Sequence, residues 1–488
     1  MVIESLKYKI LQQFGFAPTQ EQGQALDTFV SFLTDRDPQA VMILRGSAGT
    51  GKTSLSGAIV RTLLQIRQKV MLLAPTGRAA KVFSLGSGAP AYTIHRRIYR
   101  EKAFAGVDGQ FSLNDNLYTD TLFMVDEASM IANMGLGGTT FGSGCLLDDL
   151  VKFVYQGHND RLLLIGDKAQ LPPVGEEESP ALSASVMEGY GLKVYECDLN
   201  EVLRQSQSSG ILYNATLIRQ MITHDAVTGL PLIRFKGFAD IVMMPGAELV
   251  ASLGDSYHHV GMDETMVITR SNKRANIYNN GIRNMVLDRE EELSSGDMLM
   301  IVKNNYFWTE KEKKESGEGS AGAVPAFLAN GDRAKVLRVS NYIELYGFRF
   351  ATLLLQLPDY DDYEMQVTGM LDTLQSEAPA LTHEQQEELF RQVEEDYQHF
   401  VPLKADRMKS IRQDAYFNAL QIKYAYAVTC HKAQGGQWAH VYVDQGYMTD
   451  DMLTPDYIHW LYTAFTRATD KLFLVNWPKE QTCEPTDL

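Results

Sequence analysis

A glycine-rich turn in the first part of the chain is the feature that most constrains its fold. Residues 46–53 read G-S-A-G-T-G-K-T, and they lie between an apolar run, Ala40 to Leu44, and a helix-forming run, Ser54 to Ile66. A buried strand that turns into a helix through such glycines directs successive backbone N–H groups toward a polyphosphate. A chance glycine turn would lack this strand and helix on either side. The sequence therefore predicts an α/β domain that binds and hydrolyses ATP.

The residues of this turn have separate expected roles. Lys52 is expected to reach the terminal phosphates, and Thr53 is expected to offer its hydroxyl to Mg²⁺. The other nucleotide-binding residues expected in the turn are Gly46, Ala48, Gly49, Thr50 and Gly51.

Length and composition indicate a chain of several globular domains. With 488 residues it is too long for one core and is expected to form roughly two to four domains. It has no apolar run of membrane-spanning length, and Met1 to Gln13 has neither the apolar core nor the cleavage pattern of a signal peptide. The four cysteines are widely separated and form no C-x-x-C pair, so neither a disulfide framework nor a zinc or iron–sulfur site is indicated. We therefore expect a cytoplasmic protein with no membrane partner.

The acidic balance of the chain bears on nucleic-acid binding. A formal net charge of −16 argues against such a partner, because phosphate binding depends on Lys and Arg. Much of the acid, however, is concentrated in two segments, Asp359 to Glu364 and Leu381 to Phe400. A local basic groove elsewhere on the surface therefore stays compatible with the composition.

Apolar runs of strand length recur in the first part of the chain, and each ends in a polar or glycine-containing motif. These runs are Val41–Leu44, Val70–Leu73, Leu122–Val125 and Leu162–Ile165. Near-continuous apolar strands separated by helical stretches predict a parallel sheet that is covered on both faces. Because ligands bind at the carboxyl ends of such strands, we expect the motifs to form one shared site.

A second set of short apolar runs predicts a second α/β domain with a long insertion. The runs are Met266–Ile268, Tyr424–Val428, Val441–Val443 and Leu472–Val475. The insertion, from about Asn305 to Lys423, is expected to begin with a mobile loop, Lys311 to Ala323, rich in Lys, Glu, Gly and Ser. Alternating runs at Arg333–Val339 and Phe348–Leu357 suggest a small barrel, and the acidic stretch from Thr382 is expected to form a helix.

Two further elements of an ATPase site can be read from the sequence. Asp126 and Glu127 follow a buried strand, where unpaired charge is costly, so Asp126 is expected to hold the Mg²⁺ shell and Glu127 to orient and deprotonate the attacking water. Arg204 and Arg467 are candidate arginine fingers, a contribution on the order of 10³–10⁵ in rate. If they lie on opposite walls of a cleft between the two α/β domains, ATP closes that cleft and hydrolysis releases it.

The order of the motifs resembles one helicase family. The set GSAGTGKT, APTGRAAK, TIH, DEAS, GDKAQLPPVG, EVLRQ, AVTCHKAQGGQ and LYTAFTRA is similar to the helicase motifs of superfamily 1B, specifically the RecD/Dda-type 5′→3′ DNA helicases, from about residue 16 to 476. The resemblance implies two RecA-like domains with ATP between them and single-stranded DNA across their tops. The implied domains are 1–205 with a hairpin insertion at about 97–120, then 206–304 with 424–488, and an SH3-like barrel with an acidic helical projection at 305–423.

Three glutamines take roles from the resemblance. Gln22 is expected to read adenine, although it also suits the first turn of a helix for which Thr19 is a good N-cap. Gln170 is expected to sense the γ-phosphate. Gln437 stands where the family commonly has an acidic residue, and its amide could still bond to a ribose hydroxyl.

DNA contacts are implied at the other strand ends. The residues are Pro75, Thr76, Arg78, Thr93, His95, Thr269, Arg270, Asn272, Thr429, His431 and Lys432. Hydroxyls, amides and cations in these places suit phosphate oxygens and position a strand without reading its sequence. For His95 and His431 the alternative is a buried histidine with a structural hydrogen bond.

Strand separation needs a physical wedge, and relatives place a hairpin between the TIH and DEAS motifs. Ala103 to Phe111 contains Asp-Gly between two short runs with aromatics, which is a strong hairpin signal. Phe104 or Phe111 is expected to stack at the fork, and the alternative is that both anchor the hairpin on its domain.

The resulting hypothesis is a Mg²⁺-ATP-dependent DNA helicase that moves 5′→3′ on single-stranded DNA and separates forked duplex, working as a monomer. A first alternative is a single-stranded DNA translocase that remodels protein–DNA complexes or serves a larger repair or defence complex. A second is an ATP-dependent DNA clamp without directional motion. The acidic helix is expected to brace the barrel, to repel DNA from a wrong path, or to meet a basic protein partner.

Overall fold

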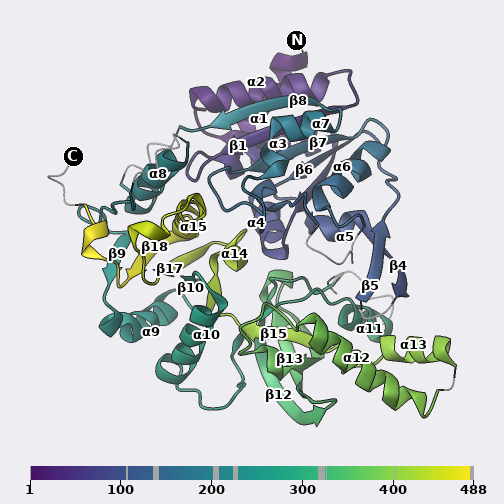
Figure 1. The fold of residues 1–488 in the computed structure, drawn as a ribbon. Coiled ribbons are helices and arrows are strands. Elements are labelled where there is room, and N and C mark those ends of the chain that lie inside the picture. The colour runs from purple at the N-terminus through teal and green to yellow at the C-terminus, as the bar shows by residue number, and fades with distance from the viewer. Residues whose placement is uncertain are drawn as a thin grey trace. The chain divides into compact units, whose positions relative to one another are not determined.

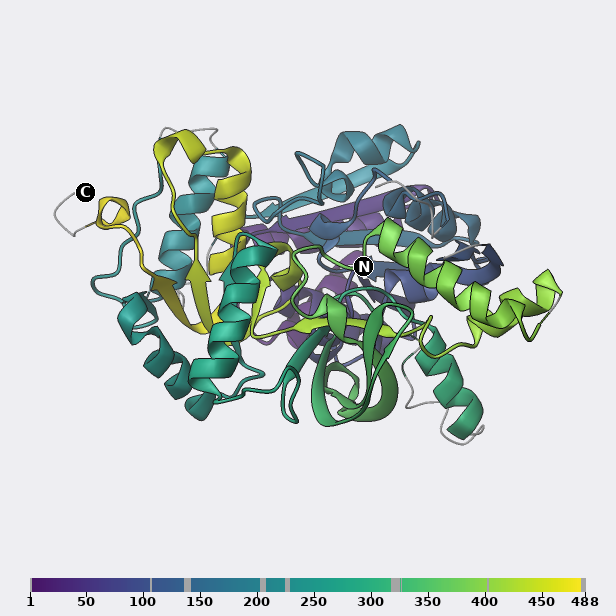
Figure 2. The same ribbon diagram turned by 60° about the horizontal axis from the view of Figure 1, so that its bottom comes forward.

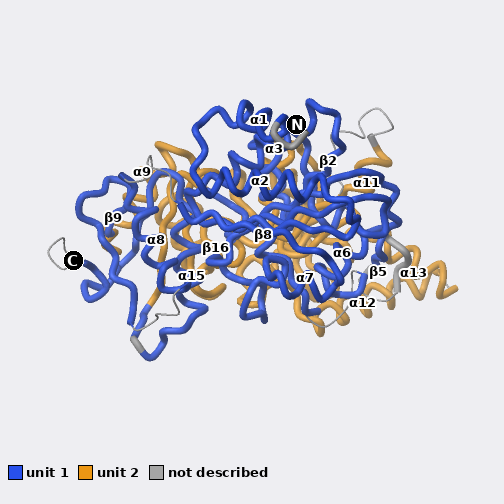
Figure 3. The backbone as a smooth tube through the Cα atoms, turned by 90° about the horizontal axis from the view of Figure 1, so that it is seen from above, with its two compact units in different colours: residues 1–243, 433–437, 447–488 blue, residues 244–432, 438–446 orange. Residues whose placement is uncertain are grey.

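The chain packs into two compact units. The computed structural model describes residues 2–105, 108–135, 142–201, 208–223, 229–316, 325, 327–401 and 403–483. Unit 1 contains residues 1–243, 433–437 and 447–488, and unit 2 contains residues 244–432 and 438–446 (Figure 3). These units are defined by which residues pack together. The domain boundaries expected from the sequence are a separate matter and stay a prediction.

A six-stranded sheet in the order β3-β2-β6-β7-β1-β8 forms the centre of unit 1 (Figure 1). Its strands are β1 Ala40–Gly46, β2 Lys69–Ala74, β3 Ala91–Thr93, β6 Thr121–Val125, β7 Arg161–Gly166 and β8 Lys193–Leu199. Every neighbouring pair is parallel. The predicted parallel α/β sheet is therefore confirmed. The edge strands β3 and β8 were not expected from the sequence. In β8 every residue before Leu199 is exposed or half-buried, and the strand has no continuous apolar run.

Helices cover both faces of this sheet because its inner strands are buried on both sides. Met42 and Leu44 of β1 pack in one core with α1, α2 and α3, whereas Val41 and Ile43 pack in the opposite core with α5 and α6. The helices of unit 1 are α1 Val2–Phe14, α2 Gln20–Thr34, α3 Lys52–Gln65, α4 Gly77–Ser87, α5 Ile94–Ile98, α6 Leu146–Gln156, α7 Ala184–Gly189, α8 Gly210–Thr223 and α15 Pro455–Phe465. Strand β9 Ile241–Met244, except for its last residue, and strand β18 Ala468–Val475 also belong to this unit.

The expected hairpin is present, with a different turn from the one predicted. Strand β4, Tyr99–Ala105, pairs antiparallel with β5, Asp108–Leu113, and Asp108 faces Ala105. The Asp-Gly pair therefore lies in β5 and is not the turn, because the strand register continues through both residues. The residues between the two strands lie outside the described part of the chain.

Unit 2 contains a second set of parallel strands in the order β16-β10-β17. Their bounds are β10 Thr265–Thr269, β16 Ala427–Thr429 and β17 Trp438–Asp444, and helices α9 Leu249–His259, α10 Asn272–Gly281 and α14 Cys430–Ala433 accompany them. The predicted single run Tyr424–Val428 is wrong in one respect: β15 ends at Tyr424 and β16 begins at Ala427, so the run is shared by two strands of different sheets.

The insertion forms a closed five-stranded barrel, as predicted. Its strands are β11 Met298–Ile301, β12 Arg333–Leu345, β13 Phe348–Leu357, β14 Tyr363–Met370 and β15 Leu420–Tyr424. Figure 2 looks along this barrel, drawn in green, with α12 and α13 in lighter green beside it. Three helices belong to the insertion: α11 Phe307–Ser316, α12 His383–Gln398 and α13 Lys404–Arg412. Barrel closure uses β11, which precedes the expected insertion.

Two expectations for the insertion have different outcomes. The acidic helix is confirmed, and Thr382 caps it. Leu389 and Val393 of that helix pack with Phe350 of the barrel and Ile411 of α13, which supports the bracing role. The expected mobile loop from Lys311 is wrong up to Ser316, because α11 includes these residues and Trp308 anchors it through an indole N–H bond to the Asn418 carbonyl (2.9 Å). In the part of the chain that the structure describes, no helix has both the length and the hydropathy to cross a membrane.

Candidate nucleotide site and nucleic-acid contacts

The glycine-rich turn joins β1 to α3 in a backbone conformation that favours glycine. Gly49 and Gly51 adopt left-handed backbone angles, with φ of 78° and 80°, and Gly51 is the N-cap of α3. At Gly46 a Cβ atom would lie 2.8 Å from Lys52 Cγ and 3.0 Å from Leu199 Cβ. The turn is therefore a tight cradle of backbone around Lys52 at a helix N-terminus, which suits a polyphosphate.

The Lys52 ammonium is held by the cradle itself. Its Nζ donates to the Gly46 carbonyl and to the Ser47 carbonyl, the latter at 3.2 Å. The Thr50 hydroxyl donates to the same Ser47 carbonyl at 2.8 Å. The first turn of α3 carries no acidic residue. Positive charge at this strand end therefore faces only neutral oxygens in its hydrogen bonds.

Two carboxylates follow β6, next to β7 in the sheet. Asp126 accepts the backbone N–H of Glu127 at 2.9 Å, and burial together with the Glu127 charge raises the pKa of Asp126 to about 7, with Lys52 opposing the shift. Glu127 has a φ of 52°, a left-handed conformation that costs a non-glycine residue about 1–3 kcal/mol and is found at functional sites. Because the protein gives the Asp126 carboxylate few hydrogen bonds and a carboxylate neighbour, a divalent cation is a suitable partner for it.

The protein offers few oxygen ligands for that cation. Among the described residues no group of three His, Cys, Asp or Glu side chains could hold a metal ion. Mg²⁺ bound through Asp126 and Thr53 would keep waters and phosphate oxygens as its other ligands, which is how Mg²⁺ is usually bound beside phosphates.

Gln170 lies on the segment that follows β7, between the strands that carry the phosphate turn and the carboxylates. The side chain is 6% exposed, and its Oε1 has no hydrogen-bond partner among the described residues. A buried amide oxygen without a partner is costly and is expected to find water or a ligand. The geometry is compatible with the expected role at the γ-phosphate, which stays a prediction.

A tyrosine of α15 links the phosphate turn to the segment after β7. The Tyr462 hydroxyl donates to Asp167 Oδ2 at 2.6 Å and accepts the Ala48 backbone N–H at 3.0 Å. Burial and the Asp167 charge raise the pKa of Tyr462 well above its usual value, so the hydroxyl keeps its proton. Neither side chain was expected at the site from the sequence, although Tyr462 belongs to the LYTAFTRA motif.

Further side chains of α15 hold the same segment. The Thr463 hydroxyl accepts the Leu171 N–H at 2.8 Å, and His459 Nδ1 lies 2.9 Å from the Ala169 carbonyl. The Leu171 carbonyl accepts Gln434 Nε2 at 2.7 Å. Residues one turn apart on α15 thus fix the position of the strand end that carries Gln170.

The two expected arginine fingers have different outcomes. Arg467 is 2% exposed, and its guanidinium donates to the Thr463 carbonyl (3.1 Å), the Gly436 carbonyl (3.1 Å) and the Thr466 hydroxyl (3.2 Å). It lies in unit 1 with the phosphate turn, and its role as a finger stays a prediction. Arg204 lies outside the described residues.

An arginine that the sequence analysis did not single out contacts the phosphate turn. Arg219 of α8 donates through Nη1 to the Ser47 hydroxyl and lies 3.4 Å from Asn200 Oδ1. Nothing in the local sequence of α8 distinguishes this residue from a surface arginine, so only the fold brings it to the site.

The other two glutamines are placed as follows. Gln22 is 1% exposed, donates to the Thr50 carbonyl at 2.9 Å and accepts the Thr19 N–H at 3.0 Å, which confirms the capping of α2 by Thr19. Both ends of its amide are therefore engaged, and adenine reading stays a prediction. Gln437 is exposed, and its backbone carbonyl accepts a hydrogen bond from Arg78 Nη2 at 2.6 Å.

The expected DNA contacts of unit 1 lie at the ends of β2 and β3. Pro75 and Thr76 follow β2, and Thr93 ends β3. The Thr76 and Thr93 hydroxyls cap α4 and α5. Burial lowers the pKa of His95 to about 4, so its ring is neutral at pH 7, and it lies 5.7 Å from the Tyr99 ring. A neutral ring binds phosphate only as a hydrogen-bond donor, which leaves both interpretations of His95 open.

The expected DNA contacts of unit 2 also gather at strand ends. Thr269 and Thr429 face each other at the ends of β10 and β16. Thr269 is buried and donates to the Ser271 carbonyl at 3.1 Å, whereas Arg270 and His431 are exposed. Asn272 Nδ2 donates to the Glu377 carbonyl at 3.2 Å.

Two lysines of unit 2 share one environment. Burial, with a smaller effect of the Lys423 charge, lowers the pKa of Lys432 to about 8, and burial lowers the pKa of Lys423 to about 8 as well. Lys432 donates to Asn330 Oδ1, and Lys423 donates to the Ser376 carbonyl. Desolvated cations with neutral partners are suited to bind phosphate.

The candidate wedge residues differ in what the structure says of them. Phe111 is half-buried and packs against the core that lines one face of the unit 1 sheet, which supports the anchoring interpretation for this ring. The Phe104 side chain lies outside the described part, so the wedge hypothesis now depends on that residue.

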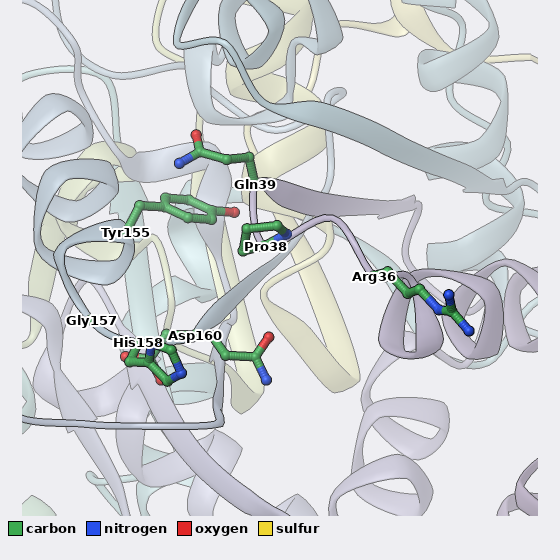
Figure 4. Close-up of a pocket in the computed structure, with 8 residues that line it drawn as sticks. Arg36, Pro38, Gln39, Tyr155, Gly157, His158 and Asp160 are labelled. Carbon is green, nitrogen blue, oxygen red and sulfur yellow. The ribbon is translucent and has the colours of Figure 1, made fainter.

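A cavity of about 460 Å³ lies at the other end of β1, beside Gln39, Tyr155 and Asp160 (Figure 4). The Tyr155 hydroxyl donates to the Ala40 carbonyl at 2.9 Å, and Asp160 accepts the Thr121 N–H at 2.9 Å. Arg36 extends away from the other labelled side chains (Figure 4). This cavity is at the amino end of the strand, away from the phosphate turn.

Two parts of the chain match known domain families. Residues 17–229 match the family described as "AAA domain", and residues 424–475 match the "UvrD-like helicase C-terminal domain". These regions contain the phosphate turn with both carboxylates and the α15 motif with Arg467.

Related proteins match over parts of very different length. The uncharacterised protein MJ1519 of Methanocaldococcus jannaschii is 33% identical over 168 residues, which are 32% of this chain and 13% of that protein. The ATP-dependent RecD2 DNA helicase of Deinococcus radiodurans is 30% identical over 157 residues, which are 32% of this chain and 18% of that protein. The uncharacterised protein R530 of Acanthamoeba polyphaga mimivirus is 22% identical over 508 residues, covering 90% of this chain and 96% of that protein. The chain thus spans less than a fifth of MJ1519 and of RecD2.

Among solved structures, the Pif1 helicase from Bacteroides in complex with ADP-AlF3 and single-stranded DNA matches at a TM-score of 0.45. The identity is 13%, over 96% of this chain and 95% of that one.

Proposed function

We propose that this chain, a superfamily 1B helicase by its ordered motifs and its two matched domains, hydrolyses ATP to move 5′→3′ along single-stranded DNA and separate duplex. The observation that carries the proposal is the linkage through Tyr462. One hydroxyl bonds both the phosphate turn and the segment that bears Gln170, and it comes from the helix that precedes Arg467. A nucleotide in the turn would therefore act on the helix of the last motif.

The residues around the turn divide the work of hydrolysis. Lys52 holds the terminal phosphates, and Glu127 orients the attacking water and takes its proton. Arg467 and Arg204 stabilise the charge that develops on the transferring group. Asp126 and Thr53 would hold Mg²⁺, which would supply charge neutralisation on the phosphate oxygens.

The strand-end residues form the proposed DNA track. Their hydrogen-bond donors are hydroxyls and amides, together with the cations Arg78, Arg270 and Lys432. Such a set suits the phosphate oxygens of DNA and does not read the bases. We therefore propose little sequence preference, and we place the chain on DNA as a monomer. Phe104 is the proposed wedge at the fork.

Unwinding of forks with a 5′ tail or a 3′ tail tests the proposal, with Lys52→Ala as the inactive control. The expected result is ATP-dependent strand separation from the 5′ tail only. Separation from the 3′ tail only would overturn the polarity.

Two further measurements separate the alternatives. Streptavidin displacement without unwinding would favour a translocase that remodels protein–DNA complexes. ATP turnover that does not rise with the length of the single strand would favour a clamp.

A further inference from the structure

Arg219 of α8 forms a hydrogen bond with the phosphate turn, and its contacts with the described residues do not neutralise its charge. Its Nη1 donates to the Ser47 hydroxyl, and Asn200 Oδ1 is 3.4 Å away. Both partners are neutral oxygens, and among the described residues Arg219 forms no ion pair with a carboxylate. A guanidinium has five N–H donors and a fixed positive charge, so these contacts leave most of its binding capacity unused.

A structural arginine in the same unit is held differently. Arg45, the residue before the turn, is 8% exposed and lies against two carboxylates, with Nε 2.7 Å from Asp198 Oδ1 and Nη2 2.7 Å from Glu196 Oε2. Arg45 is therefore neutralised within the protein. Arg219 is not, and its position at Ser47 places the uncompensated charge beside the turn.

Side chains of three helices, α3, α8 and α15, form hydrogen bonds with residues 46–48. The Lys52 ammonium lies against the Gly46 and Ser47 carbonyls, the Tyr462 hydroxyl lies against the Ala48 N–H, and Arg219 lies against the Ser47 side chain. The charge of Arg219 also acts on the titration of Tyr462, which places the two side chains near each other. Two cations around one short loop repel each other unless an anion lies between them.

We propose that Arg219 is a ligand of the terminal phosphate of ATP, which it reaches by exchanging the Ser47 hydroxyl for a γ-phosphate oxygen. This inference rests on the proposed ATPase function. The planar guanidinium forms paired bonds to phosphate oxygens, and these bonds strengthen as negative charge develops during transfer. Because ADP lacks the γ-phosphate, the contact distinguishes the two nucleotides and connects α8 to the state of the site.

Nucleotide binding by the full chain without DNA tests this assignment. The probes are Mg²⁺-ADP and Mg²⁺-ADP with aluminium fluoride, which imitates the transferring phosphoryl group. For Arg219→Ala we expect ADP affinity within about 2-fold of the parent, at least ~10-fold weaker binding of the fluoride complex, and an ATP turnover lower by on the order of 10²–10³. Arg219→Lys keeps the positive charge but loses the planar guanidinium. Its affinity for the fluoride complex and its ATP turnover should therefore lie between those of the parent and those of Arg219→Ala.

A matched variant controls for a structural role. Gln220→Ala, at the neighbouring exposed position of α8, should behave as the parent. Thermal melting of each variant checks folding.

Equal weakening of both probes by Arg219→Ala and Arg219→Lys, the same loss in Gln220→Ala, or no loss at all would overturn the proposal. The failure of the wider function gives a separate result. If the parent chain binds the fluoride complex but separates no duplex, the helicase proposal fails while the assignment of Arg219 stands.

Discussion

Asp126 in unit 1 and Asp444 in unit 2 both end a parallel strand, yet their surroundings differ. Asp444 is 4% exposed, accepts the Tyr278 hydroxyl at 2.6 Å and Arg274 Nε at 2.8 Å, and is thereby neutralised. Asp126 accepts one backbone N–H, lies beside a second carboxylate and has a pKa raised to about 7. At the strand end in unit 2, protein side chains thus satisfy the carboxylate of Asp444. At the strand end in unit 1, the carboxylate of Asp126 still lacks a cationic partner among the described residues.

The contrast extends to the other polar groups of the phosphate site. Gln170 Oε1 is buried without a partner among the described residues, and Lys52 and Arg219 bond only neutral oxygens. Such groups cost stability in the ligand-free protein and are retained where they bind something. Incomplete satisfaction of polar groups, more than the sheet topology, thus distinguishes the candidate phosphate site from the strand end at Asp444.

The largest expected effect comes from removing the central cation of unit 1. Lys52→Ala should lower single-strand-stimulated ATP turnover by on the order of 10²–10³, because no other ammonium among the described residues forms a hydrogen bond with the turn. Steady-state phosphate release measures it. Lys69→Ala is the control, since that lysine contacts Thr119 at the amino end of β2, away from the strand ends that carry the site, and should leave turnover unchanged. Equal turnover in Lys52→Ala and Lys69→Ala would show that hydrolysis does not depend on the cation at the phosphate turn.

Removing the Tyr462 hydroxyl should have the next largest effect. Tyr462→Phe leaves Asp167 and the Ala48 N–H each without one partner, at a cost of about 1–3 kcal/mol in the free energy of unfolding, and should lower ATP turnover roughly 10-fold. Chemical denaturation and phosphate release measure the two quantities. Tyr155→Phe loses a bond of similar length to the Ala40 carbonyl and should leave turnover intact. If both variants lose turnover alike, the linkage has no special role.

Neutralising the two aspartates should shift stability in opposite directions. Asp126→Asn removes an uncompensated charge and should raise the free energy of unfolding by about 1 kcal/mol while abolishing ATP turnover. Asp444→Asn removes the partner of Arg274 and Tyr278 and should lower it by about 1 kcal/mol, a modest value because the Arg274 side chain is 45% exposed. Thermal melting without nucleotide or Mg²⁺ measures both. Shifts of the same sign would break the comparison.

Lys432 is an exception within unit 2, and its effect should be the smallest. Its pKa of about 8 means that it is charged at pH 7 and mostly neutral at pH 9. Affinity for single-stranded DNA should therefore fall a further ~3-fold over this range relative to Lys432→Gln, and the substitution should reduce the salt slope by about 1. Lys409→Gln on α13 is the control. An unchanged pH profile in Lys432→Gln would remove this lysine from the track.

The elements that could be predicted from the sequence are those whose signal is local. The phosphate turn, the inner strands β1, β2, β6 and β7, and the cap of α2 by Thr19 each follow from a local motif, a continuous apolar run or a cap within a few residues. The edge strand β8 is exposed or half-buried before Leu199 and lacks such a run. The α11 segment has the composition of a loop, yet it is a helix that Trp308 anchors through its bond to the Asn418 carbonyl.

Side chains that meet only through the tertiary fold were not predictable in the same way. Arg219 and Ser47, and likewise Tyr462 and Asp167, are far apart in the chain, and no spacing rule relates them. The hairpin was expected from Asp108-Gly109, but its register follows the pairing of β4 and β5 and places that dipeptide inside a strand. Local turn preference is weak against a full ladder of cross-strand bonds.

The closed barrel has a consequence for how so long an insertion is tolerated. An open sheet presents unpaired N–H and C=O groups at its margins, and these can pair with another molecule and seed aggregates. The ring of β11 to β15 has no such margin, because β11 bonds to both β12 and β15. The chain therefore acquires a whole extra module between two strands without gaining a surface that recruits unwanted copies of itself.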